Sequence, residues 1–270
     1  MSQINNATVL ITGGASGIGR LMGELCLEKG AKRLVIWDMD ADKLTAAKAD
    51  LKSKGYDVIG NLIDISDTET IIQSAKQILN TYGPVDILIN NAGIVVGKFF
   101  EEHSHTEIDK TMQINTQAMM HITREFLPAM ITAQKGHIVN IASAAGLAAN
   151  PQMAVYVASK WAVIGWSETL RLELESKSKG LHVTTVTPFY ISTGMFEGVK
   201  SPIVPIVKPE SAAWQIIHAI EKNKVFCRMP WIVYAMPFFK GILPQRWFDA
   251  LIGKWFGIYS SMEQFKGKVK

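Results

Sequence analysis

Short apolar runs alternate along most of the chain with longer segments of mixed polarity. The runs are partly β-branched and show no polar alternation, which is typical of strands buried on both faces of a parallel sheet. Strands are predicted at Ala7–Ile11, Leu34–Trp37, Val58–Leu62, Val85–Ile89, His137–Ile141 and Val183–Val186. Helices are predicted at about Gly17–Lys29, Ala41–Lys54, Asp67–Tyr82, Thr106–Ala133 and Ala154–Ser178.

This alternation of strands and helices predicts an α/β protein with a doubly wound sheet. The 270 residues suffice for one large domain, and no repeat or linker divides them. We therefore expect a single domain over residues 1–270, with its core at residues 5–222. The pattern breaks from about Ser192 onward, and residues 223–270 are expected to form an apolar C-terminal extension.

Composition narrows the classes of function. The formal net charge of +4 is small and dispersed, so a nucleic-acid partner is not indicated. Cys26 and Cys227 lie outside any CxxC or Cys/His cluster, so no metal site and no disulfide framework are expected. The N-terminus has no signal-peptide pattern, and the uncharged run Met229–Phe239 is too short to span a bilayer. A cytoplasmic protein is expected.

A glycine-rich loop joins the first predicted strand to the first predicted helix: Thr12-Gly13-Gly14-Ala15-Ser16-Gly17-Ile18-Gly19. Glycines allow a backbone to turn sharply and to approach a pyrophosphate closely, and the helix N-terminus then offers free N–H groups. The spacing is GxxxGxG rather than GxGxxG. The alternative is an ordinary glycine-rich turn, which the position directly after the first strand disfavours.

Asp38 ends the second predicted strand, nineteen residues after Gly19. A carboxylate there can accept hydrogen bonds from both ribose hydroxyls of an adenosine and would repel a 2′-phosphate. Neither Met39 nor Ser16 offers the positive charge that a 2′-phosphate needs, so NAD is predicted over NADP. Asp38 could instead cap the next helix, although Asp40 could also fill that role.

Tyr156 and Lys160 are four residues apart, and Ser143 lies thirteen residues before the tyrosine. On a helix, Tyr156 and Lys160 share one face and can act on one reaction centre. A nearby positive charge moves the tyrosine pKa from about 10 toward neutrality, which would let the phenol exchange a proton with an alcohol or carbonyl. The alternative is a helix with a buried tyrosine and a lysine that extends to solvent.

These motifs occur in one order together with Asn90-Asn91-Ala92-Gly93 and Asn115. The combination resembles the short-chain dehydrogenase/reductase superfamily over about residues 5–222. The resemblance implies a single Rossmann domain with seven parallel strands and helices on both faces. It also implies dimers or tetramers formed through the two long helices, 106–133 and 154–178.

The resemblance implies the catalytic roles. Tyr156 matches the acid/base, Ser143 the serine that hydrogen-bonds the substrate oxygen, and Lys160 the lysine that binds the nicotinamide ribose and lowers the tyrosine pKa. Asn115 matches the asparagine whose backbone holds a proton-relay water. As a poor helix former in the middle of a predicted helix, Asn115 also invites a special explanation.

The resemblance likewise implies a cofactor site. Besides Tyr156 and Lys160, its residues are Gly13, Ser16, Gly17, Ile18, Gly19, Asp38, Asp64, Ile65, Asn91, Ala92, Gly93, Pro188 and Thr193. One departure stands out, because the family's Pro-Gly reads Pro188-Phe189 here. Phe189 lacks the conformational freedom of glycine and adds bulk beside the expected nicotinamide.

Nine aromatic residues lie within residues 231–259: Trp231, Tyr234, Phe238, Phe239, Trp247, Phe248, Trp255, Phe256 and Tyr259. Pro230 precedes this segment and Pro237 and Pro244 interrupt it, which predicts short broken helices. One interpretation is an apolar extension packed on itself or a subunit interface. The other is a lipophilic wall over the active site that also rests on a membrane, with Lys240, Arg246 and Lys254 near the headgroups.

The stretches Pro188–Phe196 and Ser261–Gly267 resemble the branch of retinol dehydrogenases and 17β-hydroxysteroid dehydrogenases. Relatives in that branch often carry an N-terminal membrane segment, for which this sequence shows no pattern. We therefore expect an NAD-dependent dehydrogenase of lipophilic alcohols such as retinoids, steroids or long-chain alcohols. A 3-oxoacyl-thioester reductase and a nucleotide-binding scaffold without turnover are the alternatives.

Overall fold

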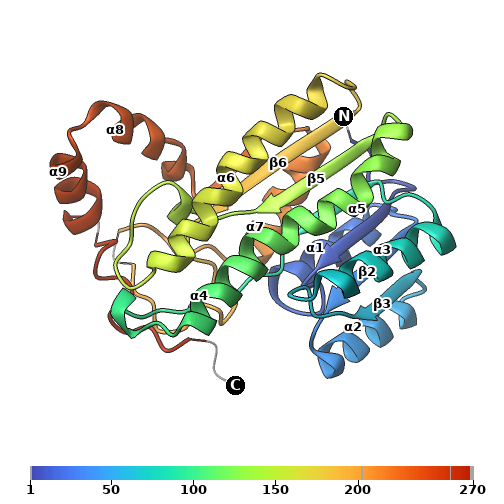
Figure 1. Ribbon diagram of the computed structural model, residues 1–270, viewed down its shortest axis with the longest axis horizontal. Helices are drawn as coiled ribbons and strands as arrows, with labels where there is room; N and C mark the ends of the chain where they lie inside the picture. Colours follow the sequence, from blue (N-terminus) through green and yellow to red (C-terminus); the bar gives the residue numbers. More distant parts are fainter. Residues whose placement is uncertain (1, 202, 256, 268–270) are drawn as a thin grey trace.

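The computed structural model describes residues 2–201, 203–255 and 257–267 (Figure 1). Its strands are β1 (Thr8–Thr12), β2 (Arg33–Asp38), β3 (Val58–Leu62), β4 (Ile87–Asn90), β5 (Gly136–Ile141), β6 (Leu181–Pro188) and β7 (Phe226–Met229). Its longer helices are α1 (Gly17–Glu28), α2 (Ala41–Ser53), α3 (Thr68–Tyr82), α4 (His105–Met112), α5 (Ala118–Thr132), α6 (Ala154–Glu175) and α7 (Pro209–Glu221).

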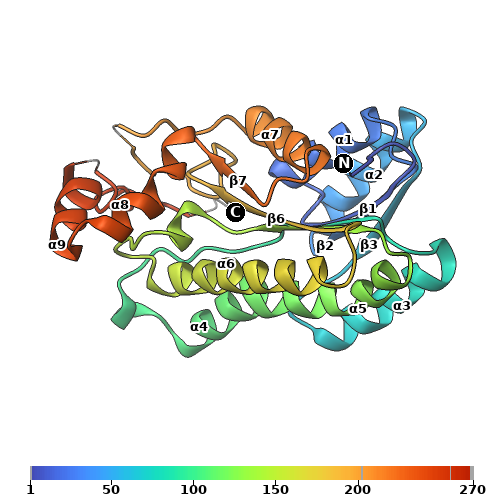
Figure 2. The same cartoon turned by 90° about the horizontal axis from the view of Figure 1, so that it is seen from above.

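The seven strands form one parallel sheet in the order β3-β2-β1-β4-β5-β6-β7. Helices α1, α2 and α7 cover one face of the sheet, and α3, α5 and α6 cover the other (Figure 2). The strand order reverses between β1 and β4, where ligands bind in open α/β sheets. The predicted fold class, a doubly wound Rossmann domain, is confirmed.

The end of the core differs from the prediction. Strand β7 pairs with β6 from Thr185↔Phe226 to Pro188↔Met229, beyond the predicted core limit at residue 222. Helix α7 precedes it and was not predicted. Its buried residues Ala212, Ala213, Ile216, Ile217 and Ile220 repeat at helical spacing, so the signal was present in the sequence. By contrast, β7 is only four residues long and contains Arg228, so its sequence shows no clear strand pattern.

The predicted helix 106–133 is interrupted. Between α4 and α5 lies a turn of π-helix, Gln113–Gln117, with Asn115 at its centre. π-Helical turns are rare in proteins, and those that occur are often found at functional sites. The structure therefore supplies the special explanation that the asparagine in mid-helix required.

The C-terminal segment forms short broken helices, as predicted. They are the 3₁₀ turn Trp231–Tyr234, α8 (Met236–Ile242), α9 (Gln245–Phe248) and the π-helical stretch Asp249–Trp255. Both views show α8 and α9 at one end of the molecule, away from the sheet (Figures 1 and 2).

Two buried asparagines join the sheet to the helices beneath it. Asn90 Nδ2 on β4 donates to Asn140 Oδ1 on β5 (2.9 Å) and to Thr123 Oγ1 on α5 (3.0 Å). Asn140 Nδ2 donates to Ser167 Oγ on α6 (2.9 Å). Buried polar groups of this kind are costly when they lose a partner.

We therefore expect Asn140→Ala to lower the free energy of unfolding by about 2 kcal/mol, because it removes a partner from Asn90 and from Ser167 in the protein interior. Urea denaturation measures this effect. The control is Asn80→Ala on the exposed face of α3, where the change should stay within about 0.5 kcal/mol. Equal effects of the two substitutions would contradict a stabilising role for the network.

Candidate active site

The glycine loop has the backbone shape of a dinucleotide cradle. Gly13 (φ 64°) and Gly17 (φ 56°) lie in the left-handed region that favours glycine. A Cβ on Gly19 would lie 2.3 Å from the carbonyl oxygen of Gly13, so only glycine fits there. Ser16 is the N-cap of α1, but its side chain makes no capping bond. The first N–H groups of α1 and its positive dipole end are thus suited to bind phosphate.

The segment after β4 holds this loop in place. Asn91 Nδ2 donates to the carbonyls of Thr12 (3.0 Å) and Gly13 (3.2 Å). The backbone N–H groups of Asn91 and Ala92 both donate to Thr12 Oγ1 (3.0 Å each). Asn91 and Ala92, predicted as cofactor residues, therefore lie directly against the glycine loop.

Asp38 lies at the carboxyl end of β2, beside the same loop. Its two carboxylate oxygens accept the N–H groups of Ala15 (3.0 Å) and Asp40 (3.1 Å). Asp40, and not Asp38, caps α2 by accepting the N–H of Lys43. Each oxygen of Asp38 keeps acceptor capacity for a ribose hydroxyl.

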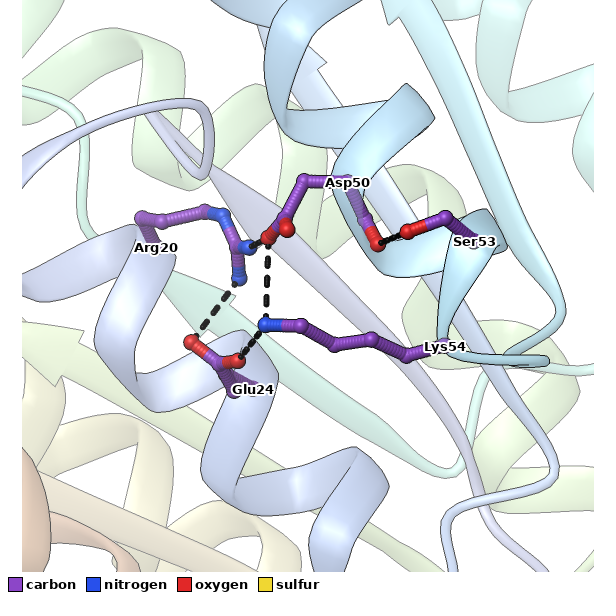
Figure 3. Close-up of polar contacts among 5 residues, drawn as sticks. All are labelled: Arg20, Glu24, Asp50, Ser53 and Lys54. Atoms are coloured by element: carbon purple, nitrogen blue, oxygen red, sulfur yellow. Dashed lines mark hydrogen bonds and ion pairs between the residues drawn. The ribbon is translucent and has the colours of Figure 1, made fainter.

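Arg20 is the basic residue nearest to the glycine loop in sequence, and its charge is balanced. It pairs with Glu24 and Asp50, and Lys54 pairs with the same two carboxylates (Figure 3). This cluster ties α1 to α2, the helices that flank Asp38. Both cations are satisfied by carboxylates, which leaves less positive charge for a 2′-phosphate.

Asp64 and Ile65 follow β3 at the same edge of the sheet. Ile63 N–H donates to the Asp38 carbonyl (2.9 Å), which aligns this segment with the end of β2. Asp64 accepts the N–H and the hydroxyl of Ser66, and Ile65 is buried. Ile18, on the other side of the loop, packs against the core as a half-buried residue.

Asn115 links the π-helical turn to the segment after β4. Its Oδ1 accepts the N–H of Ile94 (2.8 Å), and its Nδ2 donates to the Ile94 carbonyl (2.9 Å) and to Ser159 Oγ (3.1 Å). A Cβ on Gly93 would lie 3.1 Å from Asn115 Oδ1 and 3.7 Å from Lys160 Nζ. Gly93, Asn115 and Lys160 thus meet at one point.

Tyr156 lies on the first turn of α6 and is buried. Burial raises its pKa above the ordinary value, the Ser143 side chain lowers it, and Tyr190 raises it further. The lowered tyrosine pKa that the resemblance implied is thus not found here, because desolvation of the phenolate outweighs the favourable contacts. Ser143 caps the 3₁₀ turn Ala144–Gly146 through the N–H of Ala145 (3.1 Å).

Lys160 lies one turn further along α6, on the same face. Its Nζ is 5.6 Å from the centre of the Tyr156 ring and donates to the carbonyl of Ile141 at the end of β5 (2.9 Å). Burial lowers its pKa to about 8. The lysine does not extend to solvent, so the alternative interpretation of the motif is wrong in that respect.

Pro188 ends β6, and Phe189 needs no glycine-like backbone. The N–H of Phe189 donates to the Met229 carbonyl on β7 (2.7 Å), and its φ is not positive. A Cβ on Gly17 would lie 3.8 Å from Thr193 Cβ. Thr193 therefore lies against the glycine loop at Gly17.

A mainly apolar pocket opens beside Ser143. Sequence reasoning missed most of its lining, which comes from three distant segments: Ala144, Ala145, Ala148, Asn150, Met153, Phe189, Tyr190, Phe196, Met236 and Ile258. Phe196 also contacts the Tyr156 ring (centroids 6.0 Å apart). No local sequence pattern marks these residues, since the fold alone brings them together.

The predicted wall over this pocket is aliphatic rather than aromatic. Met236 and Ile258 are the lining residues from the C-terminal segment, whereas Trp231 (79% exposed), Phe238 (64%) and Trp247 (70%) lie on the surface. Phe248 is buried among the residues that cover Ala144 and Ala148. Phe256 lies outside the described residues.

Lys240 is engaged with the protein and not with solvent alone. Its Nζ lies 3.6 Å from the centre of the Trp161 ring and donates to the carbonyl of Leu147 (3.0 Å). Trp161 Nε1 in turn donates to the carbonyl of Ala145 (3.1 Å). Lys240 therefore attaches α8 to the loop that carries Ser143.

The fold and this site together define a dinucleotide-dependent dehydrogenase. The model of the short chain dehydrogenase family matches residues 7–203. The chain is 37% identical to human epidermal retinol dehydrogenase 2, over 97% of this chain and 86% of that protein. It is 33% identical to human estradiol 17-beta-dehydrogenase 11, over 93% and 87%.

Among solved structures, a short chain dehydrogenase/reductase from Burkholderia phymatum in complex with NAD superposes with a TM-score of 0.81. The two chains are 26% identical, over 94% of this chain and 97% of that one. The chain belongs to the short-chain dehydrogenase/reductase family, in the branch of retinol and 17β-hydroxysteroid dehydrogenases. It is an oxidoreductase acting on CH–OH groups.

The buried ammonium of Lys160 should reduce stability. Its pKa is near 8 in the folded chain and 10.5 when exposed, so at pH 7 folding must bury a charge. We expect Lys160→Met to raise the free energy of unfolding at pH 7 by about 2 kcal/mol and to abolish turnover.

As pH rises from 8 to 10, the folded lysine loses its proton before the unfolded one does, so wild type gains stability and the difference should shrink. Urea denaturation of both proteins without added cofactor, at pH 7 and pH 10, measures it. A variant that is less stable than wild type at pH 7 would contradict a costly buried charge.

Proposed function

We propose that this protein interconverts a lipophilic alcohol and its carbonyl with NAD as cofactor. The observation that carries the proposal is the junction of three features. Tyr156, Lys160 and Ser143 meet, an apolar pocket opens at Ser143, and the glycine loop lies at the same edge of the sheet. Retinoids, steroids and long-chain alcohols match the pocket's apolar lining.

In the oxidation direction, the substrate hydroxyl lies between Ser143 and Tyr156. Ser143 orients the substrate oxygen, and ionised Tyr156 takes the hydroxyl proton. The nicotinamide of a bound NAD⁺ would supply the hydride acceptor for the carbinol carbon. Lys160, as an ammonium, gives one proton to a water on the Asn115 backbone and then takes up the proton that Tyr156 has accepted, so one proton moves outward in total. Burial raises the tyrosine pKa, and a positive charge on Lys160, whose Nζ lies 5.6 Å from the centre of the tyrosine ring, favours the phenolate.

For the cofactor we propose the residues that the sequence predicts. Gly13, Ser16, Gly17, Ile18 and Gly19 would hold the pyrophosphate, Asp38 the adenosine ribose, and Asp64 and Ile65 the adenine. Asn91 to Gly93 would lie against that ribose and Lys160 would bind the nicotinamide ribose, while Thr193, in the segment that Pro188 opens, would contact the carboxamide. The free acceptor capacity of Asp38 and the balanced charge of Arg20 support NAD over NADP.

A 3-oxoacyl-thioester reductase would use the same catalytic residues. Asp38 disfavours it, because such reductases usually use NADPH and a carboxylate at this position repels the 2′-phosphate. The apolar lining of the pocket also fits a lipid alcohol better than a polar thioester carrier.

Tyr156→Phe should lower kcat for alcohol oxidation at least about a thousandfold, because it removes the group that moves the proton. NAD affinity, measured by calorimetry, should remain within about threefold of wild type, since the phenol ring and its packing persist. Phe196→Leu, which alters the same aromatic contact without removing a proton carrier, is the control. A Tyr156→Phe variant with substantial turnover would remove the tyrosine from the mechanism.

We further propose that the C-terminal segment rests on a membrane surface. No helix of the described residues is long and apolar enough to cross a bilayer. The segment nevertheless exposes large apolar side chains, Trp231, Phe238, Ile242 and Trp247. Its helices α8 and α9 lie at one end of the molecule (Figure 1). Arg246 and Lys254 are exposed in the same segment and suit anionic headgroups.

The pocket wall formed by Met236 and Ile258 belongs to the same segment, so lipophilic substrate could enter from the bilayer. The cytoplasmic location and the dimer or tetramer remain predictions.

A Trp231→Ser/Trp247→Ser variant should lose at least about tenfold in affinity for vesicles of phosphatidylcholine and phosphatidylserine, because two interfacial anchors are removed. Co-sedimentation measures this, and turnover of a short water-soluble alcohol should persist. The control is Trp214→Ser, which removes a 56% exposed tryptophan from α7. Equal binding by all three proteins, or a change in oligomeric state instead, would assign the surface to another role.

A further inference from the structure

A chain of buried hydrogen bonds forms part of the pocket wall and joins three distant segments. Asn150 Nδ2 lies 2.8 Å from the hydroxyl of Tyr190, which lies 2.8 Å from Ser261 Oγ. Ser261 Oγ lies 2.6 Å from the carbonyl of Ile258. Asn150, Tyr190 and Ile258 all line the pocket beside Ser143.

The directions of these hydrogen bonds follow from one end of the chain. The Ile258 carbonyl can only accept, so the Ser261 hydroxyl donates to it. Ser261 Oγ then accepts the proton of the Tyr190 hydroxyl. The Tyr190 oxygen in turn accepts from Asn150, so the amino group of the Asn150 side chain faces Tyr190.

This orientation leaves the amide oxygen of Asn150 without a partner. Oδ1 is buried, and no group of the described residues donates to it. The amino group is fully used, since it also contacts Ser261 Oγ (3.2 Å) and Met153 Sδ (3.4 Å). Turning the amide around would place Oδ1 against Tyr190, whose hydroxyl would then have to give up its bond to Ser261 Oγ in order to donate to it. A buried acceptor without a donor is unfavourable. Other buried polar atoms of the described residues also lack a partner, among them Asn90 Oδ1, but of these residues only Asn150 lines the pocket, where a ligand can supply the donor.

The surroundings of Asn150 indicate where that donor would come from. The pocket is otherwise lined mainly by alanine, aromatic and aliphatic side chains, and the hydroxyl of Tyr190 is already committed. Met153 touches both Asn150 and Tyr190 and is unbranched and flexible, so it can move aside for a ligand. Asn150 is therefore a second polar point in an apolar pocket, separate from Ser143.

We propose that Asn150 Oδ1 accepts a hydrogen bond from a second hydroxyl of the substrate, remote from the carbon that is oxidised. Asn150 is then a specificity-determining residue, and the preferred substrates are lipophilic diols or hydroxy ketones rather than simple alcohols. This inference rests on the proposed function, because it concerns the substrate of the same site.

Three alcohols of one steroid skeleton test the inference. They share the oxidisable secondary alcohol and carry hydroxyl, methoxy or hydrogen on the far ring. Wild type should favour the hydroxyl compound about tenfold in kcat/KM over each of the others, mainly through KM, because the bond forms equally in ground and transition states. A ratio near one for hydroxyl against methoxy would overturn the proposal without any variant.

Asn150→Leu, of similar size but without polar atoms, should remove this preference and leave turnover of the compound with hydrogen within about twofold of wild type. Met153→Leu is the matched control, because it alters the neighbouring lining residue and should keep the preference. An equal loss for all three compounds would show that Asn150 only supports Tyr190 and would overturn the proposal. If wild type oxidises other lipophilic alcohols but none of these three compounds, the proposal for Asn150 is also overturned. If wild type oxidises no alcohol at all, the proposed function itself is rejected.

Discussion

The contact between Thr12 and Asn91 is the interaction on which the site depends. It joins the carboxyl ends of β1 and β4, the point where the strand order reverses and a crevice must open. The same asparagine holds the Gly13 carbonyl, which in turn leaves no room for a side chain on Gly19. Because the strands are parallel, every other functional segment ends at this edge. The cradle, Asp38 and the Tyr156–Lys160 pair are consequences of one topology.

Proton transfer requires charged forms of Lys160 and Tyr156 to be buried at the carboxyl edge of the sheet. Lys160 lies in the interior and donates to the Ile141 carbonyl, and burial lowers the pKa of Lys160 while it raises that of Tyr156. Both shifts oppose the phenolate–ammonium form that proton transfer needs. The site gives up stability for a proton relay that works in a dry pocket.

Much of this arrangement was predictable from the sequence, and the failures have physical causes. Glycines, Asp38 and the Tyr156/Lys160 spacing are local signals, and parallel pairing brings them to one edge. Strand β7 was not predicted, because four residues that include an arginine show no clear hydrophobic periodicity. The direction of the tyrosine pKa shift depends on burial by Phe196 and Tyr190, which no spacing encodes. The bonds from Asn150 to Tyr190 and Ser261 span up to 111 residues and exist only in the folded chain.

The most direct test is reduction of NAD⁺ and of NADP⁺ by the purified protein, over a panel containing retinol, a 17β-hydroxysteroid, a long-chain alcohol and a 3-hydroxyacyl thioester. The account predicts turnover of at least one apolar alcohol, with kcat/KM for NAD⁺ at least about tenfold above that for NADP⁺. Turnover confined to the thioester, or a preference for NADP⁺, would contradict the roles given to the pocket and to Asp38.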